Sequence, residues 1–262
     1  MSFLAEKELF IFDMDGTLYL GDRVLPCAVE FIKKLRAAGK RVVFYTNNST
    51  RGSADYLERL ERLGFEPSQQ EILSSGDVTA EFLLRERRGK KVFLVGTPEL
   101  ERDYSQRGIV LDRDADIVVS AFDTTLTYEK TATACKLIYR GAEFFSTHMD
   151  TCCPTDTGFV PDSGAIAALL AAATGKKPRF FGKPDGTALD IITAKTGITR
   201  DKMSMFGDRL YTDIAFGKNN GVTAVLVLTG EATLADAAAC PAASRPDYIF
   251  PTLEQVCRAM GV

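Results

Sequence analysis

The segment most informative about the fold is Phe10-Ile11-Phe12-Asp13-Met14-Asp15-Gly16-Thr17-Leu18. The apolar run Leu9–Phe12 that enters it is compact and bounded by polar residues, which predicts a buried β-strand. Asp13 and Asp15 follow directly, and Gly16 permits a sharp turn away from the strand. Ligands of parallel sheets bind beyond the carboxyl ends of the strands, so this junction is a candidate functional site.

Outward from this stretch, short apolar runs alternate with amphipathic segments, which predicts parallel βαβ units. We expect further strands at Arg41–Thr46, Lys91–Val95, Ile117–Ser120, 203–206 and 223–228. Helices are expected at 26–38, with proline in the first turn, and at 52–63, 126–139, 165–173, 188–195 and 210–218. A last helix is expected to begin with a capping box formed by Thr252 and Gln255. The predicted fold class is α/β with a doubly wound, mostly parallel sheet.

The bulk composition excludes several classes of partner. With 262 residues the chain is long enough for two domains, and 45 % hydrophobic and 26 % charged residues are typical of a globular protein. The net charge of -3 provides no broad basic field. We therefore expect neither a nucleic-acid polymer nor a membrane surface as a partner, and an anionic substrate would need a locally positive site.

Histidine and cysteine usage narrows the chemistry further. His148 is the single histidine, so histidine-rich metal sites and Ser-His-Asp catalysis are not expected. The six cysteines form no C-x-x-C pair, which favours reduced thiols in the cytoplasm. The first residues include acidic side chains and no apolar segment of a secretion signal, and no apolar run has membrane-spanning length. We expect a cytoplasmic protein.

Polar side chains follow several of the expected strands, and their chemistry suits phosphoryl transfer. Asp13 can attack phosphorus, and Asp15 can act as general acid and then as general base for water. Lys183 would hold Asp13 ionised and offset charge on the transferring group. Thr46 and Asn47, with the neighbouring Asn48, would bind phosphate oxygens, and Mg²⁺ would be held by Asp13, Asp208, Asp213 and the Asp15 backbone carbonyl.

Each of these pieces has a simpler interpretation when taken alone. Asp-Gly-Thr is commonly a turn, Asn47-Asn48-Ser49 could cap the following helix, and Gly182-Lys183-Pro184 or Gly207-Asp208 could be surface loops. A calcium-binding EF-hand is excluded, because its sixth and twelfth positions would be Leu18 and Val24. The simpler interpretations do not explain why all the pieces occur together, in order and after strands.

The same residues resemble the four motifs of the haloacid dehalogenase (HAD) superfamily. Residues 10–18 are similar to the first motif, hhhDxDGTL, and the other three motifs are matched by Thr46-Asn47-Asn48-Ser49, Gly182-Lys183-Pro184 and the segment 207–214. Their form resembles the NagD-like, or nitrophenylphosphatase and phosphoglycolate phosphatase-like, branch. The resemblance implies Asp13 as nucleophile, Asp15 as acid and base, Lys183 as charge partner, and a phosphatase or mutase acting on a small phosphorylated metabolite.

The resemblance also implies an inserted α/β cap of the C2 type. The interval between the second and third motifs is too long for one crossover, so we assign 1–77 and 178–262 to the catalytic core and 78–177 to the cap. The segment 147–154 would be the cap's specificity loop, with His148, Asp150 and Cys153 as candidate contacts. It departs from the expected Thr-Asn-x-Asp pattern, and its adjacent cysteines fit small neutral walls better than a strained disulfide switch. Pairing of two copies through the cap is a further option in such proteins.

Three alternatives remain open from the sequence. A phosphomutase on the same fold would return the phosphoryl group to substrate instead of water. A phospho-acceptor signalling module would hold a persistent aspartyl-phosphate, although it needs no cap. A catalytically inactive binding protein on the same fold would not require Asp15.

Overall fold

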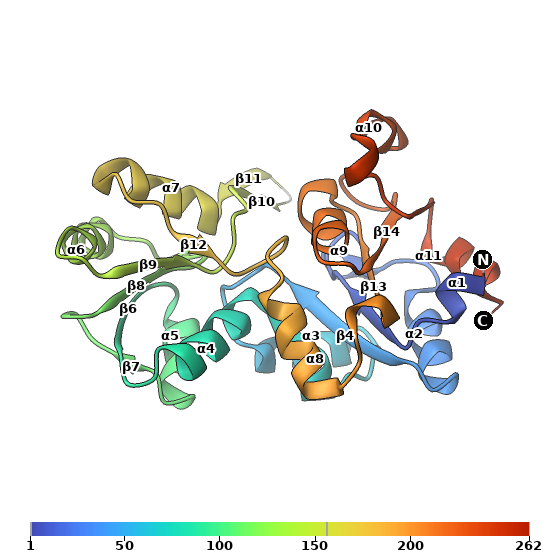
Figure 1. Cartoon of the computed structure of the whole chain (residues 1–262), viewed down its shortest axis with the longest axis horizontal. Helices are drawn as coiled ribbons and strands as arrows, with labels where there is room; N and C mark the ends of the chain where they lie inside the picture. Colours follow the sequence, from blue (N-terminus) through green and yellow to red (C-terminus); the bar gives the residue numbers. More distant parts are fainter. Residues whose placement is uncertain (1, 156, 262) are drawn as a thin grey trace. The chain divides into compact units, whose positions relative to one another are not determined.

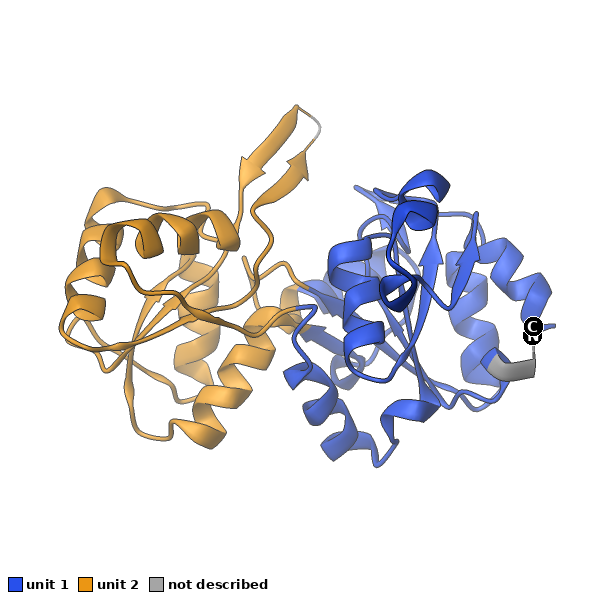
Figure 2. Cartoon of the chain, turned by 45° about the horizontal axis from the view of Figure 1, so that its top comes forward, with its two compact units in different colours: residues 1–46, 56–73, 183–262 blue, residues 47–55, 74–182 orange. Residues whose placement is uncertain are grey.

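The structure is a computed structural model that describes residues 2–155 and 157–261. The chain forms two compact units, which Figure 2 colours separately. Unit 1 comprises Met1–Thr46, Tyr56–Leu73 and Lys183–Val262, and unit 2 comprises Asn47–Asp55 and Ser74–Gly182. The edges differ from the expected cap of 78–177, since residues 47–55, 74–77 and 178–182, which were assigned to the core, group with unit 2.

Unit 1 is built on a six-stranded sheet with the strand order β15-β14-β13-β1-β4-β5. Figure 1 labels β4, β13 and β14 of this sheet. Its strands are β1 (Leu9–Phe12), β4 (Arg41–Thr46), β5 (Ile72–Ser74), β13 (Met203–Gly207), β14 (Thr223–Val227) and β15 (Tyr248–Phe250), beside a short pair β2 (Tyr19–Leu20) and β3 (Arg23–Val24). β1 pairs in parallel with both β13 and β4, so that Phe12 lies opposite Phe206 and Phe44. The carboxyl ends of these three strands therefore meet at one edge of the sheet.

Helices flank this sheet and bury its aromatic residues. They are α1 (Ser2–Ala5), α2 (Ala28–Ala37), α3 (Ser53–Arg62, shared between the units), α8 (Thr187–Thr196), α9 (Ala215–Asn219), α10 (Leu234–Ala239) and α11 (Leu253–Met260). Phe12 stacks on Phe206 with ring centroids 4.9 Å apart, and Phe31 of α2 meets Phe12 edge-on at 5.8 Å. This packing fixes the end of β1, and with it the position of Asp13.

Unit 2 has its own parallel sheet of five strands in the order β12-β9-β8-β6-β7. The strands are β6 (Lys91–Val95), β7 (Val110–Leu111), β8 (Ile117–Ser120), β9 (Glu143–Ser146) and β12 (Arg179–Phe180). Its helices are α4 (Ser75–Glu86), α5 (Pro98–Gln106), α6 (Tyr128–Tyr139) and α7 (Ser163–Thr174). An antiparallel hairpin of β10 (Cys152–Thr155) and β11 (Gly158–Pro161) stands out from this unit (Figure 2).

The structure confirms the α/β class and differs from the expected elements in several places, including three in the predicted helices. The helix expected at 26–38 begins at Ala28, because Cys27 adopts a left-handed conformation with φ 62°, and proline is therefore not in its first turn. Residues 210–218 form a π-helical turn, Leu210–Ile214, followed by the short α9. Thr252 is the N-cap of α11, but its side chain makes no capping hydrogen bond, so the predicted capping box is wrong.

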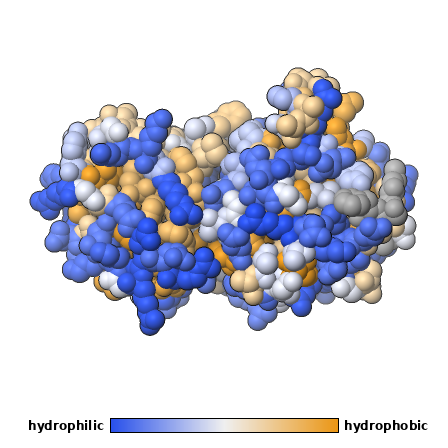
Figure 3. Space-filling view, in the orientation of Figure 1, coloured by the Kyte–Doolittle hydropathy of each residue, from blue (hydrophilic) through white to orange (hydrophobic). Residues whose placement is uncertain are grey.

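In the described part of the chain, capping boxes occur instead at two α-helices and at the 3-10 helix Gln69–Glu71, where none was expected. In α4 the Ser74 hydroxyl accepts from the Asp77 amide, and in α10 Thr233 and Asp236 do the same. Among the described residues, no helix combines the length and the apolar character needed to cross a membrane. Hydrophilic residues cover much of the face shown in Figure 3, with apolar residues scattered between them.

Candidate active site

Asp13 and Lys183 form the centre of the site in unit 1. Asp13 directly follows β1, and its amide donates to the Phe206 carbonyl, which extends the pairing of β1 and β13 by one residue. The Lys183 ammonium lies 2.5 Å from Asp13 Oδ1 and donates to the Tyr45 carbonyl of β4 at 3.3 Å. Lys183 is 2 % exposed, so its charge is directed at the carboxylates around it rather than at solvent.

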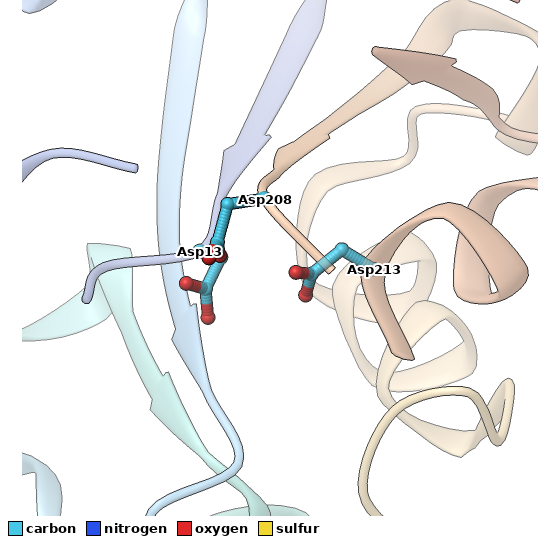
Figure 4. Close-up of side chains that lie close together, drawn as sticks. All are labelled: Asp13, Asp208 and Asp213. Atoms are coloured by element: carbon cyan, nitrogen blue, oxygen red, sulfur yellow. The ribbon is translucent and has the colours of Figure 1, made fainter. Parts of the chain in front are cut away.

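Asp208 and Asp213 complete a cluster of three carboxylates (Figure 4). Asp208 follows β13, whereas Asp213 comes from the π-helical turn, and both are buried. Carboxylate oxygens of Asp13, Asp208 and Asp213 lie within 4.8 Å of one another. Asp213 Oδ1 is 2.7 Å from Lys183 Nζ, and its Oδ2 accepts from the Arg209 amide at 3.1 Å.

Two glycines form a cradle for the Asp208 carboxylate. An added Cβ on Gly16 would lie 2.5 Å from Asp208 Oδ2, and one on Gly230 would lie 2.0 Å from the same atom. Gly16 also has φ +84°, a conformation that L side chains rarely adopt. Asp208 Oδ2 accepts from the Glu231 amide at 2.8 Å, while its buried Oδ1 has no hydrogen-bond partner among the described residues. That acceptor atom, beside two further carboxylates, fits an oxygen-ligated divalent cation.

Burial and mutual repulsion govern ionisation in this cluster. Burial raises the pKa of Asp13 to about 8, Lys183 opposes the shift, and Asp213 and Asp208 add to it. The pKa of Asp208 rises to about 7, chiefly through burial and then through Asp213. Burial alone would lower the pKa of Lys183, but Asp13 and Asp213 raise it, so the ammonium stays charged. A bound cation would favour the ionised form of all three carboxyls.

Asp15 lies two residues after Asp13, in the loop that follows β1, and is exposed. The surrounding protein raises its pKa by desolvation, while Arg59 and Arg209 lower it. Because the carboxyl keeps contact with solvent, water screens part of this shift. A carboxyl with a raised pKa, beside a nucleophile that a bound cation would keep ionised, suits the role of proton donor.

The predicted phosphate-binding residues lie at and beyond the end of β4. Thr46 is the last residue of β4 and belongs to unit 1, whereas Asn47 and Asn48 belong to unit 2. The Asn48 side-chain oxygen accepts from the Thr50 amide at 3.0 Å and from the Thr50 hydroxyl at 2.8 Å, which makes a local turn. Helix α3 begins only at Ser53, so this segment does not cap it.

The expected specificity loop lies in unit 2. His148 is fully buried, and Asp150 is 5 % exposed. Cys152 and Cys153 are thiols outside any disulfide and are adjacent on β10, so their side chains point to opposite faces of the hairpin. The Asn47 side-chain amide donates to Asp150 Oδ2 at 3.1 Å, which joins the second motif to this loop within one unit.

Sequence reasoning missed two groups that the structure brings into these clusters. Arg209 follows Asp208 in the fourth motif; its amide binds Asp213, and its Nε lies 3.0 Å from Glu231 Oε2. The position of Arg209 within the fourth motif could have identified it from the sequence. Asp162 is the N-cap of α7, and its Oδ1 lies 3.2 Å from His148 Nε2. No local sequence pattern predicts that contact.

Comparisons with known proteins agree with this geometry. Residues 10–110 match the model of the haloacid dehalogenase-like hydrolases, and residues 180–256 match a second, HAD-hydrolase-like model. The acid sugar phosphatase of Staphylococcus aureus (strain MRSA252) is 32 % identical over 235 residues, covering 89 % of this chain and 91 % of that protein. The chain belongs to the haloacid dehalogenase-like hydrolases.

Solved structures of other HAD-like hydrolases share the whole architecture. The 4-nitrophenylphosphatase of Thermotoga maritima is 42 % identical with a TM-score of 0.94, covering 98 % of this chain and 99 % of that one. The glycerol phosphate phosphatase of Mycobacterium tuberculosis, in complex with magnesium, is 29 % identical with a TM-score of 0.89, covering 97 % and 77 %. This HAD-like hydrolase is a phosphatase, and its resemblance to the NagD-like nitrophenylphosphatase branch is confirmed.

Proposed function

We propose that this HAD-type phosphatase hydrolyses small phosphomonoesters, including sugar phosphates and nitrophenyl phosphate, with Mg²⁺ and through an aspartyl-phosphate on Asp13. The observation that carries the proposal is the cluster in which Lys183 contacts both Asp13 and Asp213 while Asp208 faces them. A buried cation beside a partly accessible carboxylate suits a nucleophile that must stay ionised next to an anionic substrate.

In the first step an oxygen of Asp13 bonds to phosphorus as the bond from phosphorus to the leaving oxygen breaks. Asp15 donates its proton to that leaving oxygen, so that an alcohol departs rather than an alkoxide. In the second step Asp15 accepts a proton from water while the water oxygen attacks phosphorus. The bond from phosphorus to Asp13 then breaks, which returns both carboxyl groups to their starting states and releases inorganic phosphate.

The remaining residues bind and orient. Thr46 and Asn47 supply neutral donors for the phosphate oxygens, with Asn48 as an adjoining contact. Asp13, Asp208, Asp213 and the Asp15 carbonyl would hold Mg²⁺, which when bound neutralises the carboxylates and the developing charge on the phosphoryl oxygens. Support for this metal comes from the partnerless Asp208 Oδ1 and from the magnesium complex of the M. tuberculosis relative.

The substrate class rests on the relatives and on the hairpin of unit 2. The S. aureus relative is named as an acid sugar phosphatase, and the T. maritima relative as a 4-nitrophenylphosphatase. We assign substrate selection to unit 2, with His148, Asp150 and Cys153 in or beside its specificity loop. The small side chain of Cys153 would leave room for leaving groups of varied size.

The test is phosphate release from a panel of phosphorylated metabolites and nitrophenyl phosphate, with Mg²⁺ or with a chelator. Asp13→Asn is compared with Asp114→Asn, a matched change at a carboxyl whose side chain is 89 % exposed in unit 2. Metal-dependent release that is lost only in Asp13→Asn supports the proposal. Label exchange between sugar phosphate isomers without net release would indicate a phosphomutase instead.

A further inference from the structure

His148 is a fully buried side chain between two carboxylates of unit 2. Its Nδ1 lies 3.5 Å from Asp150 Oδ2, and its Nε2 lies 3.2 Å from Asp162 Oδ1. Asp150 belongs to the same loop, whereas Asp162 is the N-cap of α7 and accepts from the Ser163 amide at 2.6 Å. Both carboxylates act on the ring and raise the pKa of His148.

This geometry favours the protonated form of the ring. An ionised carboxylate only accepts hydrogen bonds, while a neutral imidazole has one nitrogen that is itself an acceptor. Carboxylates 3.5 Å and 3.2 Å from the two ring nitrogens therefore favour a ring with both nitrogens protonated, although neither contact has hydrogen-bond geometry. The two ion pairs oppose the cost of burying the ring and raise the pKa of His148 to about 9.

The Asp150 oxygen that faces His148 also binds Asn47. Asp150 Oδ2 accepts from Asn47 Nδ2 at 3.1 Å and lies 3.5 Å from His148 Nδ1. The Asn47 carbonyl in turn accepts from the Ser75 hydroxyl at 2.5 Å. A chain of contacts thus runs from the start of α7 through His148 and Asp150 to the residue that follows β4.

Close packing leaves this chain little freedom to rearrange. An added Cβ on Gly182 would lie 2.5 Å from the His148 Cβ and 2.7 Å from Asn47 Oδ1. The His148 carbonyl accepts from the Ser146 hydroxyl at 3.2 Å, and the Gly164 amide of α7 donates to the Asp150 carbonyl at 2.8 Å. Loss of charge at His148 would remove this ion pair from the buried Asp150 carboxylate, which favours protonation or movement of that carboxyl.

We propose that His148 is a positioning residue, a buried imidazolium that clamps Asp150 and Asp162 and so fixes the Asn47 side chain for phosphate binding. The last step rests on the proposed role of Asn47, whereas the charge state of His148 does not. A group with a raised folded pKa contributes stability that is fully present below its unfolded pKa, about 6.5, and lost as the pH rises through about 9. At neutral pH the protonated His148 ring therefore pairs with both Asp150 and Asp162.

The first experiment reads the ring directly and needs no activity. Because the chain has one histidine, protein labelled with ¹⁵N-histidine and carrying no histidine tag gives signals from His148 alone. Both ring nitrogens should be protonated at pH 7.5, with the transition to the neutral ring near pH 9. A neutral ring at pH 7.5, or a transition near that of an unfolded chain, would overturn the proposal.

The second experiment separates positioning from general stability. His148→Gln should raise KM for nitrophenyl phosphate and weaken inhibition by inorganic phosphate by about tenfold, with a smaller change in kcat. The double variant His148→Gln/Asp162→Asn should recover much of that loss, because the asparagine amide can donate to the glutamine oxygen and still cap α7. Unchanged KM and phosphate inhibition in His148→Gln would contradict the clamp even if hydrolysis itself is established.

A matched control removes a different buried ion pair from the same unit. Lys130 Nζ lies 2.8 Å from Asp123 Oδ2, and the Asp123 side chain is fully buried. Lys130→Gln should lower thermal stability without changing KM or phosphate inhibition. If Lys130→Gln raises KM as much as His148→Gln does, the effect is general destabilisation and the positioning role is wrong. If the protein hydrolyses nothing in the panel, the ¹⁵N measurement still decides the charge state.

Discussion

Lys183 Nζ lies 2.5 Å from Asp13 Oδ1, and the same ammonium is 2.7 Å from Asp213 Oδ1. One buried cation therefore serves a carboxylate at the end of β1 and another in the π-helical turn. Removing one partner of a buried ion pair generally costs about 3–5 kcal/mol, because the remaining charge is left uncompensated. Lys183 is thus expected to matter both for catalysis and for the stability of unit 1.

Lys183→Met should lower kcat/KM by roughly a hundredfold or more, the range found when a charge-stabilising group is lost from an active site. It should also lower the unfolding temperature in chelator, and Mg²⁺ should restore part of that loss by replacing the missing positive charge. Steady-state kinetics and thermal unfolding with and without Mg²⁺ measure both effects. Activity within threefold of the wild type would remove Lys183 from the catalytic machinery.

Stability without metal should fall as the pH rises. The pKa of Asp13 is raised to about 8 and that of Asp208 to about 7, so between the ordinary value of 3.8 and these values the folded state binds more protons than the unfolded state. Unfolding free energy then decreases from about pH 4 to pH 8. Mg²⁺ should stabilise the protein more at pH 8 than at pH 5.5, because it displaces those protons.

Thermal unfolding at several pH values, with Mg²⁺ or chelator, measures this dependence. Asp208→Asn should flatten the slope in chelator, since the amide does not titrate, and should raise the Mg²⁺ concentration for half-maximal activity by about tenfold or more. An equal stabilisation by Mg²⁺ at pH 5.5 and pH 8 would argue against a cluster of carboxyls with raised pKa as the metal site.

Gly230 should be intolerant of a side chain for a steric reason. Gly230→Ala places a Cβ where Asp208 Oδ2 lies, at 2.0 Å, so the carboxylate must move. We expect weaker Mg²⁺ activation by about tenfold with a modest loss of stability. Gly141→Ala is the control, because Gly141 has φ +99° and open space around it, so a methyl group there costs stability alone. Similar Mg²⁺ dependence in both variants would refute the cradle.

The hairpin of unit 2 offers a test of substrate selection. Cys153 and Cys152 are neighbours on β10 and point to opposite faces, so the same change at each is a matched pair. Cys153→Leu should alter the ranking of sugar phosphates more than it alters turnover of nitrophenyl phosphate, while Cys152→Leu should alter neither. Identical rankings in all three proteins would exclude Cys153 from substrate selection.

Local signals in the sequence were enough for the central strands. β1, β4, β6 and β8 begin and end where the apolar runs do, because strands buried on both faces read as continuous apolar segments. The short strands β5 and β12 were missed, because two or three residues carry no recognisable period. The predicted capping box at Thr252 is wrong although the residue spacing fits it, because the threonine side chain makes no capping hydrogen bond.

The core of the site was predictable because each residue follows its own strand or lies one turn beyond it. Asp13 and Asp208 meet as expected, since the parallel strands β1 and β13 bring their carboxyl ends to one edge, and Asp213 lies one turn beyond Asp208. Lys183 instead follows β12, a strand of the unit 2 sheet, so strand pairing does not explain its contact with Asp13. The pairing of His148 with Asp162 could not be read in the same way. It depends on how the start of α7 packs against a loop, which no periodicity in either segment encodes.

The most direct test of the proposed mechanism is the mass of the Asp15→Asn protein after mixing with Mg²⁺ and nitrophenyl phosphate. That variant lacks the base that activates water, so the phosphorylated enzyme should accumulate. We expect the mass of Asp15→Asn to increase by one phosphoryl group. Peptide mapping should locate this group on Asp13, and it should be absent from the double variant Asp13→Asn/Asp15→Asn. A phosphoryl group on another residue, or normal turnover by Asp15→Asn, would contradict the proposed mechanism.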